Sequence, residues 1–281
     1  MELWYSEEHT PDVSLSIRID RQVYTGESEY QKIDVFDTTE FGRMLTLDGA
    51  VMLTEKDEFI YHEMMVHVPM AANPEIRRVL VIGAGDGGVV RELVKYPYVE
   101  KIDVVEIDQQ VVEVCREYFP ALTMGFDDPR VTLHFEDGVR YVRRCEEEYD
   151  LIIVDSTDPF GPGEGLSTRE FYGSCYNAIR DNGILVNQHE TPCYGKYAEV
   201  VYREHRKISK TFPLAYVYQA HIPTYPSGHW LFGFASDGIE PVNDHLEQWN
   251  ALEIQTRYYN TDLHRGCFAL PSYVKDILEG C

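Results

Sequence analysis

From residue 77 onward the sequence alternates between short apolar runs and longer segments with the periodicity of amphipathic helices. The strand-like runs are RRVLVIGAG, KIDVVEID, VTLHFEDG, YDLIIVDS and ILVNQHE. The helical segments are VVRELVKY, QQVVEVCREYF, VRYVRRCEEE, STREFYGSCYNAIRDNG and KYAEVVYREHRKISKTF, and the fourth is expected to end at Asn182-Gly183. Repeated strand–helix–strand units predict a doubly wound, mostly parallel α/β sheet. Two further strands, LAYVYQAHI and HWLFGFAS, follow each other without a helix and predict an antiparallel edge.

The first part of the chain has a different pattern, with alternation at every second residue and punctuation by glycine. The segments with this pattern are Val13–Asp20, Glu29–Thr38 and Arg43–Glu55. They predict a small antiparallel sheet, followed by a helix at Lys56–Val68 and a boundary at Asn73-Pro74. We therefore predict an N-terminal β-domain with a short connecting helix over residues 1–73, and a larger α/β domain over residues 74–281.

The strand ends of the larger domain carry carboxylates. In open α/β sheets, ligands bind beyond the carboxyl ends of the strands. The strand ends are Gly83-Ala84-Gly85-Asp86-Gly87-Gly88, Glu106-Ile107-Asp108, Glu136-Asp137-Gly138, Asp155-Ser156-Thr157-Asp158-Pro159 and Gln188-His189-Glu190. A carboxylate at a single strand end is explained by turn formation or helix capping, because aspartate is common in both. Five strand ends with carboxylates at one crevice predict a ligand site.

The turn GAGDGG resembles G-x-G-x-x-G, which is a weak signal for a nucleotide by itself. Glu106 follows about twenty residues later, the spacing at which a carboxylate accepts hydrogen bonds from ribose hydroxyls. A pyrophosphate at this turn would meet the negative charge of Asp86, which disfavours a dinucleotide. The pattern favours a nucleoside without phosphates and with a cationic side arm, and Asp137 with Gly138 could bind an adenine amine.

Charge and cysteine content narrow the function classes. The 281 residues include 48 acidic and 25 basic ones, for a net charge of -23, which argues against nucleic acid or an anionic membrane as a partner. The acidity serves either solubility or attraction of a cationic substrate, and charge alone does not decide. The start of the chain has no secretory signal pattern. Six scattered cysteines without metal-ligand spacing predict reduced thiols in the cytoplasm.

Over nearly its whole length the chain resembles the spermidine synthases, the polyamine aminopropyltransferase family. The segments that carry the resemblance are YQKIDVFDTTEFGRMLTLDG, EKDEFIYHEM, VLVIGAGDGGVVREL, DVVEID, YDLIIVDSTDP and IPTYPSG. The resemblance implies a methyltransferase-like core and transfer of an aminopropyl group from decarboxylated S-adenosylmethionine to putrescine, giving spermidine and methylthioadenosine. The donor is a co-substrate, so no cofactor and no metal are implied. A homodimer or homotetramer is implied, with the N-terminal sheet as an interface.

The resemblance also implies roles for individual residues. Asp155 with Tyr61 is expected to orient and deprotonate the attacking amine. The residues implied in donor binding are Gln31, His62, Asp86, Glu106, Asp137, Gly138, Pro162 and Leu166. Those implied in acceptor binding are Trp4, Tyr61, Asp155, Asp158, Gln188, Glu190 and Tyr225. The chain departs from the family at GPGEGL, at HETPCYGKY and at Ala84, where glycine is frequent and where alanine requires a negative φ.

The sequence is also compatible with other functions. The acceptor could be agmatine or cadaverine, and the fold would also suit an S-adenosylmethionine-dependent methyltransferase, a nicotinamide-dependent dehydrogenase or a non-catalytic binding protein. Asp86 argues against the methyltransferase and the dehydrogenase, because it opposes a carboxylate or a pyrophosphate. Taken singly, Tyr61 and His62 could be packed side chains, Tyr225 a turn residue and Trp4 an N-terminal anchor.

Overall fold

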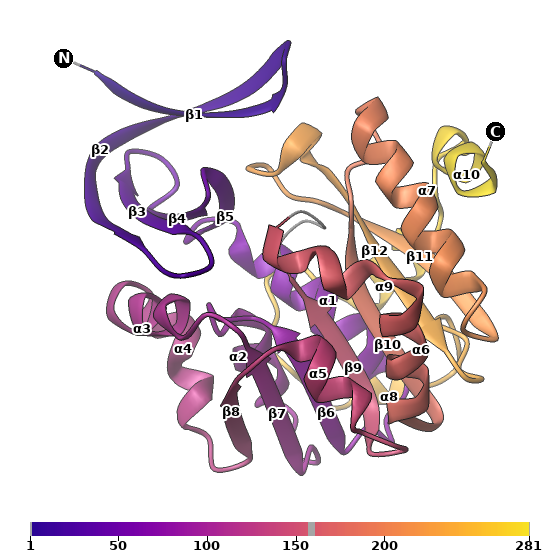
Figure 1. The fold of residues 1–281 in the computed structure, drawn as a ribbon. Coiled ribbons are helices and arrows are strands. Elements are labelled where there is room, and N and C mark those ends of the chain that lie inside the picture. The colour runs from indigo at the N-terminus through magenta and orange to yellow at the C-terminus, as the bar shows by residue number, and fades with distance from the viewer. Residues whose placement is uncertain (1, 157–160, 281) are drawn as a thin grey trace.

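The computed structural model describes residues 2–156 and 161–280, with only the backbone of residues 161 and 162. Its N-terminal part is a five-stranded sheet in the order β1-β2-β3-β4-β5, in which all neighbouring strands are antiparallel (Figure 1). The strands are β1 (Leu3–Thr10), β2 (Val13–Glu27), β3 (Lys32–Thr38), β4 (Arg43–Leu47) and β5 (Ala50–Thr54). Asp48 and Gly49, with φ of 48° and 87°, form the turn between the last two strands. The small antiparallel sheet is confirmed, and β1 is an additional strand that the sequence pattern did not predict.

The larger sheet has seven strands in the order β11-β12-β10-β9-β6-β7-β8. They are β6 (Arg78–Gly83), β7 (Lys101–Glu106), β8 (Val131–Phe135), β9 (Tyr149–Asp155), β10 (Ile179–Glu190), β11 (Leu214–His221) and β12 (His229–Ser236). The strands from β10 to β8 pair in parallel, and β12 pairs antiparallel with both β10 and β11. The doubly wound sheet with an antiparallel edge is therefore confirmed.

Helices cover both faces of this sheet (Figure 1). The α-helices are α1 (Glu58–Ala72), α2 (Gly88–Leu93), α3 (Gln109–Tyr118), α4 (Pro120–Thr123), α5 (Gly138–Arg143), α6 (Arg169–Ala178), α7 (Gly195–Ser209), α8 (Leu246–Asn250), α9 (Thr261–Cys267) and α10 (Ser272–Glu279). Short 3-10 helices are η1 (Met124–Asp127), η2 (Gly161–Ser167) and η3 (Pro226–Gly228). One core joins α1, α2, α8 and α9 to one face, and a second joins α5, α6 and α7 to the other. Apolar residues of α3 and α4 pack instead on the N-terminal sheet.

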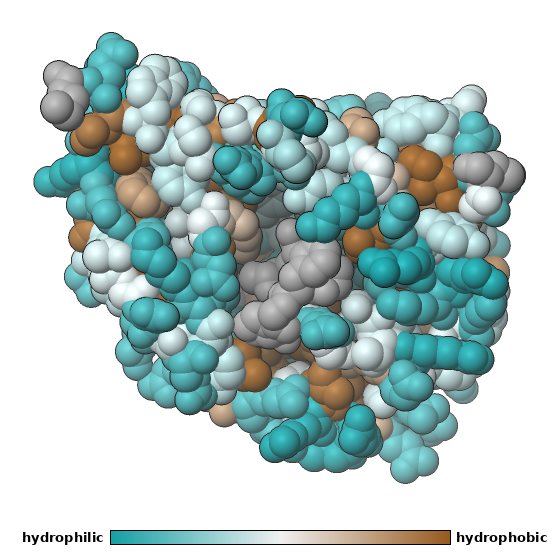
Figure 2. Space-filling model, turned by 45° about the horizontal axis from the view of Figure 1, so that its top comes forward, coloured by the Kyte–Doolittle hydropathy of each residue, from teal (hydrophilic) through white to brown (hydrophobic). Residues whose placement is uncertain are grey.

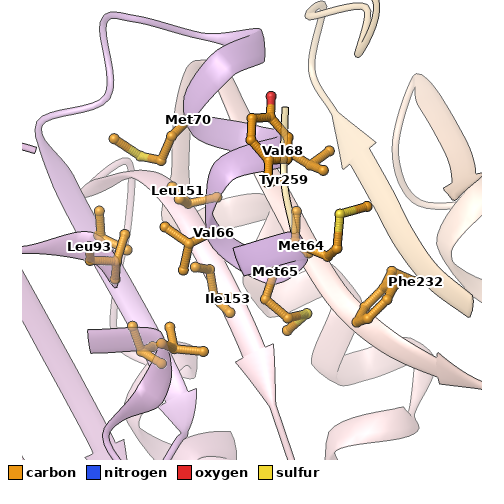
Figure 3. Close-up of a cluster of buried hydrophobic side chains, with 14 of the residues drawn as sticks. Met64, Met65, Val66, Val68, Met70, Leu93, Leu151, Ile153, Phe232 and Tyr259 are labelled. Carbon is orange, nitrogen blue, oxygen red and sulfur yellow. The ribbon is translucent and has the colours of Figure 1, made fainter. Parts of the chain in front are cut away.

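Helix α1 lies inside the first of these cores. All of its residues except Phe59 are buried, which fits a helix that is apolar on nearly every side. Figure 3 shows Met65 and Val66 of α1 near Leu151 and Ile153 of β9, and Met64 on the side of the helix that faces Phe232. The helix was expected at Lys56–Val68 but runs to Ala72, because its last turn is also buried in this core. The division of the chain at residue 73 stays a prediction, and this packing places α1 with the larger sheet.

One predicted element has the wrong boundary. The helix expected to end at Asn182-Gly183 ends at Ala178, and β10 begins at the next residue. Asn182 has a φ of 62°, and the register between β10 and β9 shifts between Ile179 and Ile184. The Asn-Gly pair therefore lies at an irregularity inside a strand and not at the end of a helix. A left-handed residue such as Asn182 is compatible with both places.

Candidate active site

A cavity lies between the carboxyl ends of the parallel strands and the N-terminal sheet. Its walls come from the ends of β6, β7, β9 and β10, from the start of α1 and from the β4–β5 hairpin. The face drawn in Figure 2 is hollowed near its centre, and hydrophilic side chains dominate its surroundings. Most residues implied by the sequence line this cavity: Gln31, Tyr61, His62, Asp86, Glu106, Asp137, Gly138, Asp155, Leu166, Gln188 and Tyr225.

The glycine-rich turn after β6 runs close to the end of β9. A Cβ atom on Gly83, whose φ is 88°, would lie 1.9 Å from the carbonyl oxygen of Asp155, so only glycine fits there. Ala84 has a φ of 64°, so the negative φ that would make alanine tolerable at this position is not adopted. Its N–H donates to the carbonyl oxygen of Asp155 at 3.0 Å, which holds this residue in a conformation that costs alanine ~1–2 kcal/mol.

Asp86 of this turn faces His62 of α1. Its Oδ1 accepts a hydrogen bond from the N–H of Gly88 at 2.7 Å and lies 3.4 Å from Nε2 of His62. Burial alone would lower the pKa of His62, but the carboxylates of Asp86 and Glu58 outweigh burial and raise this pKa to about 10. The ring is therefore an imidazolium at neutral pH. Burial opposes ionisation of Asp86, but the charge of His62 prevails and lowers the pKa of Asp86.

Glu106 ends β7 behind the same turn. Its Oε1 accepts from the N–H of Asp108 at 2.8 Å, and burial raises the pKa of its carboxyl to about 7. A Cβ on Gly85 would lie 3.0 Å from Oε2 of Glu106, so the turn passes directly over this carboxylate. Gln31 reaches the same place from the N-terminal sheet, because its Nε2 donates to Oδ2 of Asp108 at 3.0 Å.

Asp137 and Gly138 form the next part of the wall, where β8 leads into α5. Oδ1 of Asp137 accepts from the N–H of Val139 at 2.8 Å, so this aspartate caps the helix as well as facing the cavity. A Cβ on Gly138 would lie 2.4 Å from Cγ2 of Ile82, which leaves room for glycine only. Leu166 of η2 also lines the cavity, and the side chain of Pro162 is outside what the structure describes.

Tyr61 and Asp155 meet at the opposite part of the cavity. The Tyr61 hydroxyl donates to Oδ1 of Asp155 at 2.7 Å. Oδ2 of Asp155 is buried and has no hydrogen-bond partner among the described residues. Burial, followed by the nearby charge of Asp86, raises the pKa of Asp155 to about 7. The arrangement presents a carboxylate oxygen that can take a proton near neutral pH.

Tyr225 and Gln188 complete this part. Tyr225 packs its ring 5.9 Å from that of Tyr61, and its hydroxyl donates to the carbonyl oxygen of Met52 at 2.7 Å, which joins the large domain to β5. Nε2 of Gln188 donates to the carbonyl oxygen of Ser156 at 3.4 Å, and its buried Oε1 has no hydrogen-bond partner within the described part of the chain. Asp158 lies outside the described residues.

Two implied residues are placed elsewhere, and one lining carboxylate was missed. Trp4 lies on β1 with 55% of its surface exposed, and Glu190 is fully buried in β10; neither is among the described lining residues. Glu7 of β1 does line the cavity, and its Oε2 accepts from the N–H of Val51 at 3.2 Å. The sequence held no signal for Glu7, because the strand that carries it was not predicted.

Two carboxylates of the cavity lie close together. The potential ligand atoms of His62, Asp86 and Asp155 lie within 4.8 Å of one another, but a protonated His62 ring cannot bind a metal ion, which leaves the two carboxylates to face a cation. The two carboxylates suit an alkylammonium group, because its N–H groups need hydrogen-bond acceptors.

Comparison with known proteins gives a consistent result. Residues 58–244 match the model of the spermine/spermidine synthase domain, and residues 3–55 match the spermidine synthase tetramerisation domain. A polyamine aminopropyltransferase of Clostridium perfringens strain SM101 is 65% identical over 279 residues, which cover 99% of each chain. One from Alkaliphilus oremlandii is 63% identical over 280 residues, with the same coverage.

Solved structures agree with these relatives. A spermidine synthase in complex with the transition-state analogue AdoDATO matches with a TM-score of 0.96 and 43% identity, over 99% of this chain and 96% of the other. A spermidine synthase from Thermotoga maritima matches with a TM-score of 0.92 and 42% identity, over 99% of this chain and 94% of the other. Within the described residues, none of the helices is both long and apolar enough to span a bilayer.

Proposed function

This chain belongs to the spermine/spermidine synthase family, and from that premise we propose that it transfers the aminopropyl group of decarboxylated S-adenosylmethionine to putrescine. The products are spermidine and methylthioadenosine. The observation that carries the proposal is the pair of neighbouring carboxylates, Asp86 and Asp155, in a cavity that Glu106 also lines. This arrangement suits a nucleoside with a cationic arm that ends beside a proton acceptor.

The donor end of the cavity comprises Gln31, His62, Asp86, Glu106, Asp137 and Gly138. Glu106 accepts the hydrogen bonds of the ribose hydroxyls, and Asp137 with Gly138 faces the adenine. Asp86 receives the ammonium of the aminopropyl arm as a charge-assisted hydrogen bond. Since Asp86 also stands where ordinary S-adenosylmethionine would place its carboxylate, it disfavours that more common nucleoside.

The acceptor end comprises Tyr61, Asp155, Gln188 and Tyr225. The attacking amine must be neutral, and its proton goes to Oδ2 of Asp155, which has no partner among the described residues. The nitrogen lone pair then forms a bond to the carbon next to the sulfonium, and the C–S electron pair returns to sulfur as a neutral thioether. Tyr61 fixes Asp155 through its 2.7 Å hydrogen bond, so the amine is held in line with the breaking bond.

The distal ammonium of the acceptor requires acceptor groups at the far side. Gln188 presents a buried Oε1, and Glu7 presents a carboxylate from the N-terminal sheet. We propose that these two groups, rather than Trp4, bind the second amine. Asp158 stays an expected acceptor ligand on the resemblance alone. Carboxylates on both sides of a short cavity favour a diamine such as putrescine over a monoamine.

The test is incubation with decarboxylated S-adenosylmethionine and a panel of putrescine, cadaverine, agmatine and spermidine. We expect methylthioadenosine release, with the highest kcat/KM for putrescine. A higher kcat/KM for agmatine or cadaverine would keep the aminopropyltransferase and change its acceptor. Methyl transfer from S-adenosylmethionine, without methylthioadenosine release, would favour the methyltransferase alternative that the fold allows.

We also propose a homodimer or homotetramer that works in the cytoplasm. The match of residues 3–55 to a tetramerisation domain supports the assembly, and Leu3 and Trp4 expose apolar surface there. The five described cysteines are all free thiols, which suits a reducing compartment. Light scattering of the purified protein measures the assembly directly.

A further inference from the structure

Two charged residues stand directly behind His62 and are not among the described residues that line the cavity. Glu58 begins α1 one turn before His62, and its Oε2 lies 2.6 Å from Nδ1 of the ring. Arg91 of α2 donates two hydrogen bonds to the same carboxylate, from Nη1 to Oε1 at 2.9 Å and from Nη2 to Oε2 at 3.0 Å. The side chain of Glu58 is only 6% exposed. Neither residue takes part in the proposed reaction.

The His62 ring is positioned so that each of its two nitrogens faces a different side chain. A Cβ on Gly88 would lie 2.2–2.4 Å from three ring atoms, so the ring packs flat against the start of α2. Tyr61 meets the ring edge-on at 5.5 Å. Nδ1 faces Glu58, and Nε2 faces Oδ1 of Asp86 at 3.4 Å. A carboxylate behind one ring nitrogen fixes which proton the other nitrogen presents.

The four side chains form a row of alternating charge from α2 to the cavity: Arg91, Glu58, His62 and Asp86. A buried imidazolium needs such anions, because burial penalises its charge. Without Glu58, Asp86 would remain as the nearest anion to His62, and the ring would be free to turn or to lose its proton. The charge balance at Asp86 therefore depends in part on Glu58, which is not among the described residues that line the cavity.

We propose that Glu58, held by Arg91, is a positioning residue for the donor arm: it fixes His62 so that Nε2–H points at Asp86, and thereby sets Asp86 to receive the aminopropyl ammonium. This inference rests on the proposed function, because it takes the aminopropyl arm as the group that Asp86 meets. The competing explanation is structural, namely that Glu58 and Arg91 only join α1 to α2.

The two explanations differ for two related nucleosides. Decarboxylated S-adenosylmethionine carries the arm, and methylthioadenosine carries the same adenosine without it. In Glu58→Gln the amide keeps the shape of the side chain and loses its charge. We expect calorimetry to give a Kd for the donor about tenfold higher than in wild type, the loss of about 1.4 kcal/mol. The Kd for methylthioadenosine should stay within about twofold. Equal weakening of both ligands, or of neither, overturns the inference.

Asp103→Asn is the matched control. Asp103 is also a buried carboxylate paired with a histidine, 3.1 Å from Nε2 of His134, and it also forms an ion pair with Lys101. It lies on β7 and is not among the described lining residues. Its substitution should change thermal stability and leave the ratio of the two Kd values as in wild type. A changed ratio in this control would mean that any buried carboxylate alters the ratio, and the inference would fail.

A measurement on the wild-type protein covers the case in which Glu58→Gln does not fold. With 15N-labelled histidine, NMR distinguishes an imidazolium from either neutral tautomer. His62 is faced by Glu58, Asp86, Tyr61 and Asp155, and we expect it to carry both protons at pH 8. A neutral ring at pH 8 overturns the inference. Failure of the proposed function is separate, since wild-type protein would then release no methylthioadenosine with any amine.

Discussion

Asp86 and Glu106 at the donor end accept backbone hydrogen bonds from their own turns, whereas Oδ2 of Asp155 and Oε1 of Gln188 at the acceptor end have no partner among the described residues. A buried acceptor without a hydrogen bond costs about 1–3 kcal/mol, so the second arrangement is stable only if something else compensates. Under the proposed function, we expect the donor end to be organised before ligand arrives and the acceptor end to be completed by the amine. Substitutions should therefore act differently at the two ends.

The largest effect is expected at the acceptor end. Asp155→Asn preserves shape but cannot take the proton of the amine, so kcat/KM should fall ~10²–10⁴-fold. The deficit should shrink at high pH, where neutral amine is abundant. In wild type, kcat/KM should decline as the pH falls below about 7, because Asp155 then becomes protonated. Steady-state kinetics across pH 6–10 checks both, and activity within a few-fold of wild type at pH 7 would remove Asp155 from this role.

At the donor end the effect should be on binding. Asp86→Asn can keep the hydrogen bond from the N–H of Gly88, so the turn should survive. Loss of a charge-assisted hydrogen bond of ~1.5–3 kcal/mol should weaken the donor roughly ten- to a hundredfold. S-adenosylmethionine should weaken much less or bind better. Calorimetry with both nucleosides decides, and an unchanged ratio of affinities would leave Asp86 as a turn residue only.

The sequence predicted the residues of the donor end more completely than those of the acceptor end. Asp86, Glu106 and Asp137 sit on short turns after strands, where local pattern and topology together fix their place. At the acceptor end, Gln188 and Tyr225 come from separate parts of the chain, and Glu7 comes from a strand that the pattern did not predict. Trp4 is exposed on β1 and is not among the described lining residues, so its acceptor-binding role stays a prediction from the resemblance.

The fold was predicted more completely than the site, and its errors are local. The parallel pairing and the antiparallel edge follow from the order of strand-like and helix-like segments, which is a property of whole segments. The end of α6 depends on the pairing of Ile179 with Tyr149 of β9. Such contacts join residues far apart in sequence, and no local pattern records them.

Glu106 offers a smaller test of the organised donor end. Burial raises the pKa of its carboxyl to about 7, and the ribose hydrogen bonds that we propose for it are strongest when the carboxyl is ionised. Donor affinity should therefore rise several-fold between pH 6 and pH 8. Glu106→Gln should bind the donor about tenfold more weakly and lose this pH dependence. Calorimetric titrations at three pH values measure it, and a pH dependence that persists in the variant would assign it to another group.

The remaining prediction concerns stability rather than binding, and two histidines should show it with opposite sign. The pKa of His62 is about 10 in the folded protein, above its ordinary 6.5, so its contribution is complete below pH 6.5 and is lost as the pH rises toward 10. Burial lowers the pKa of His189 to about 3, so its contribution is present above pH 6.5 and is lost as the pH falls. Each amounts to about 1.4 kcal/mol per pH unit at most.

Denaturant unfolding of wild type, His62→Gln and His189→Gln between pH 5 and pH 9 measures these contributions. The destabilisation caused by His62→Gln should shrink toward pH 9, and that caused by His189→Gln should shrink toward pH 5. Parallel curves for the two variants would contradict the opposite environments assigned to the two rings.

The cavity wall opposite the parallel strands has a consequence for the protein in dilute solution. Glu7, Leu45, Val51 and Met52 line the cavity and belong to the segment that matches a tetramerisation domain. The hydroxyl of Tyr225 is anchored on that segment through Met52. If neighbouring copies hold this segment in place, mass action governs part of the active site. The specific activity per chain would then depend on enzyme concentration and fall on dilution below the dissociation constant of the assembly.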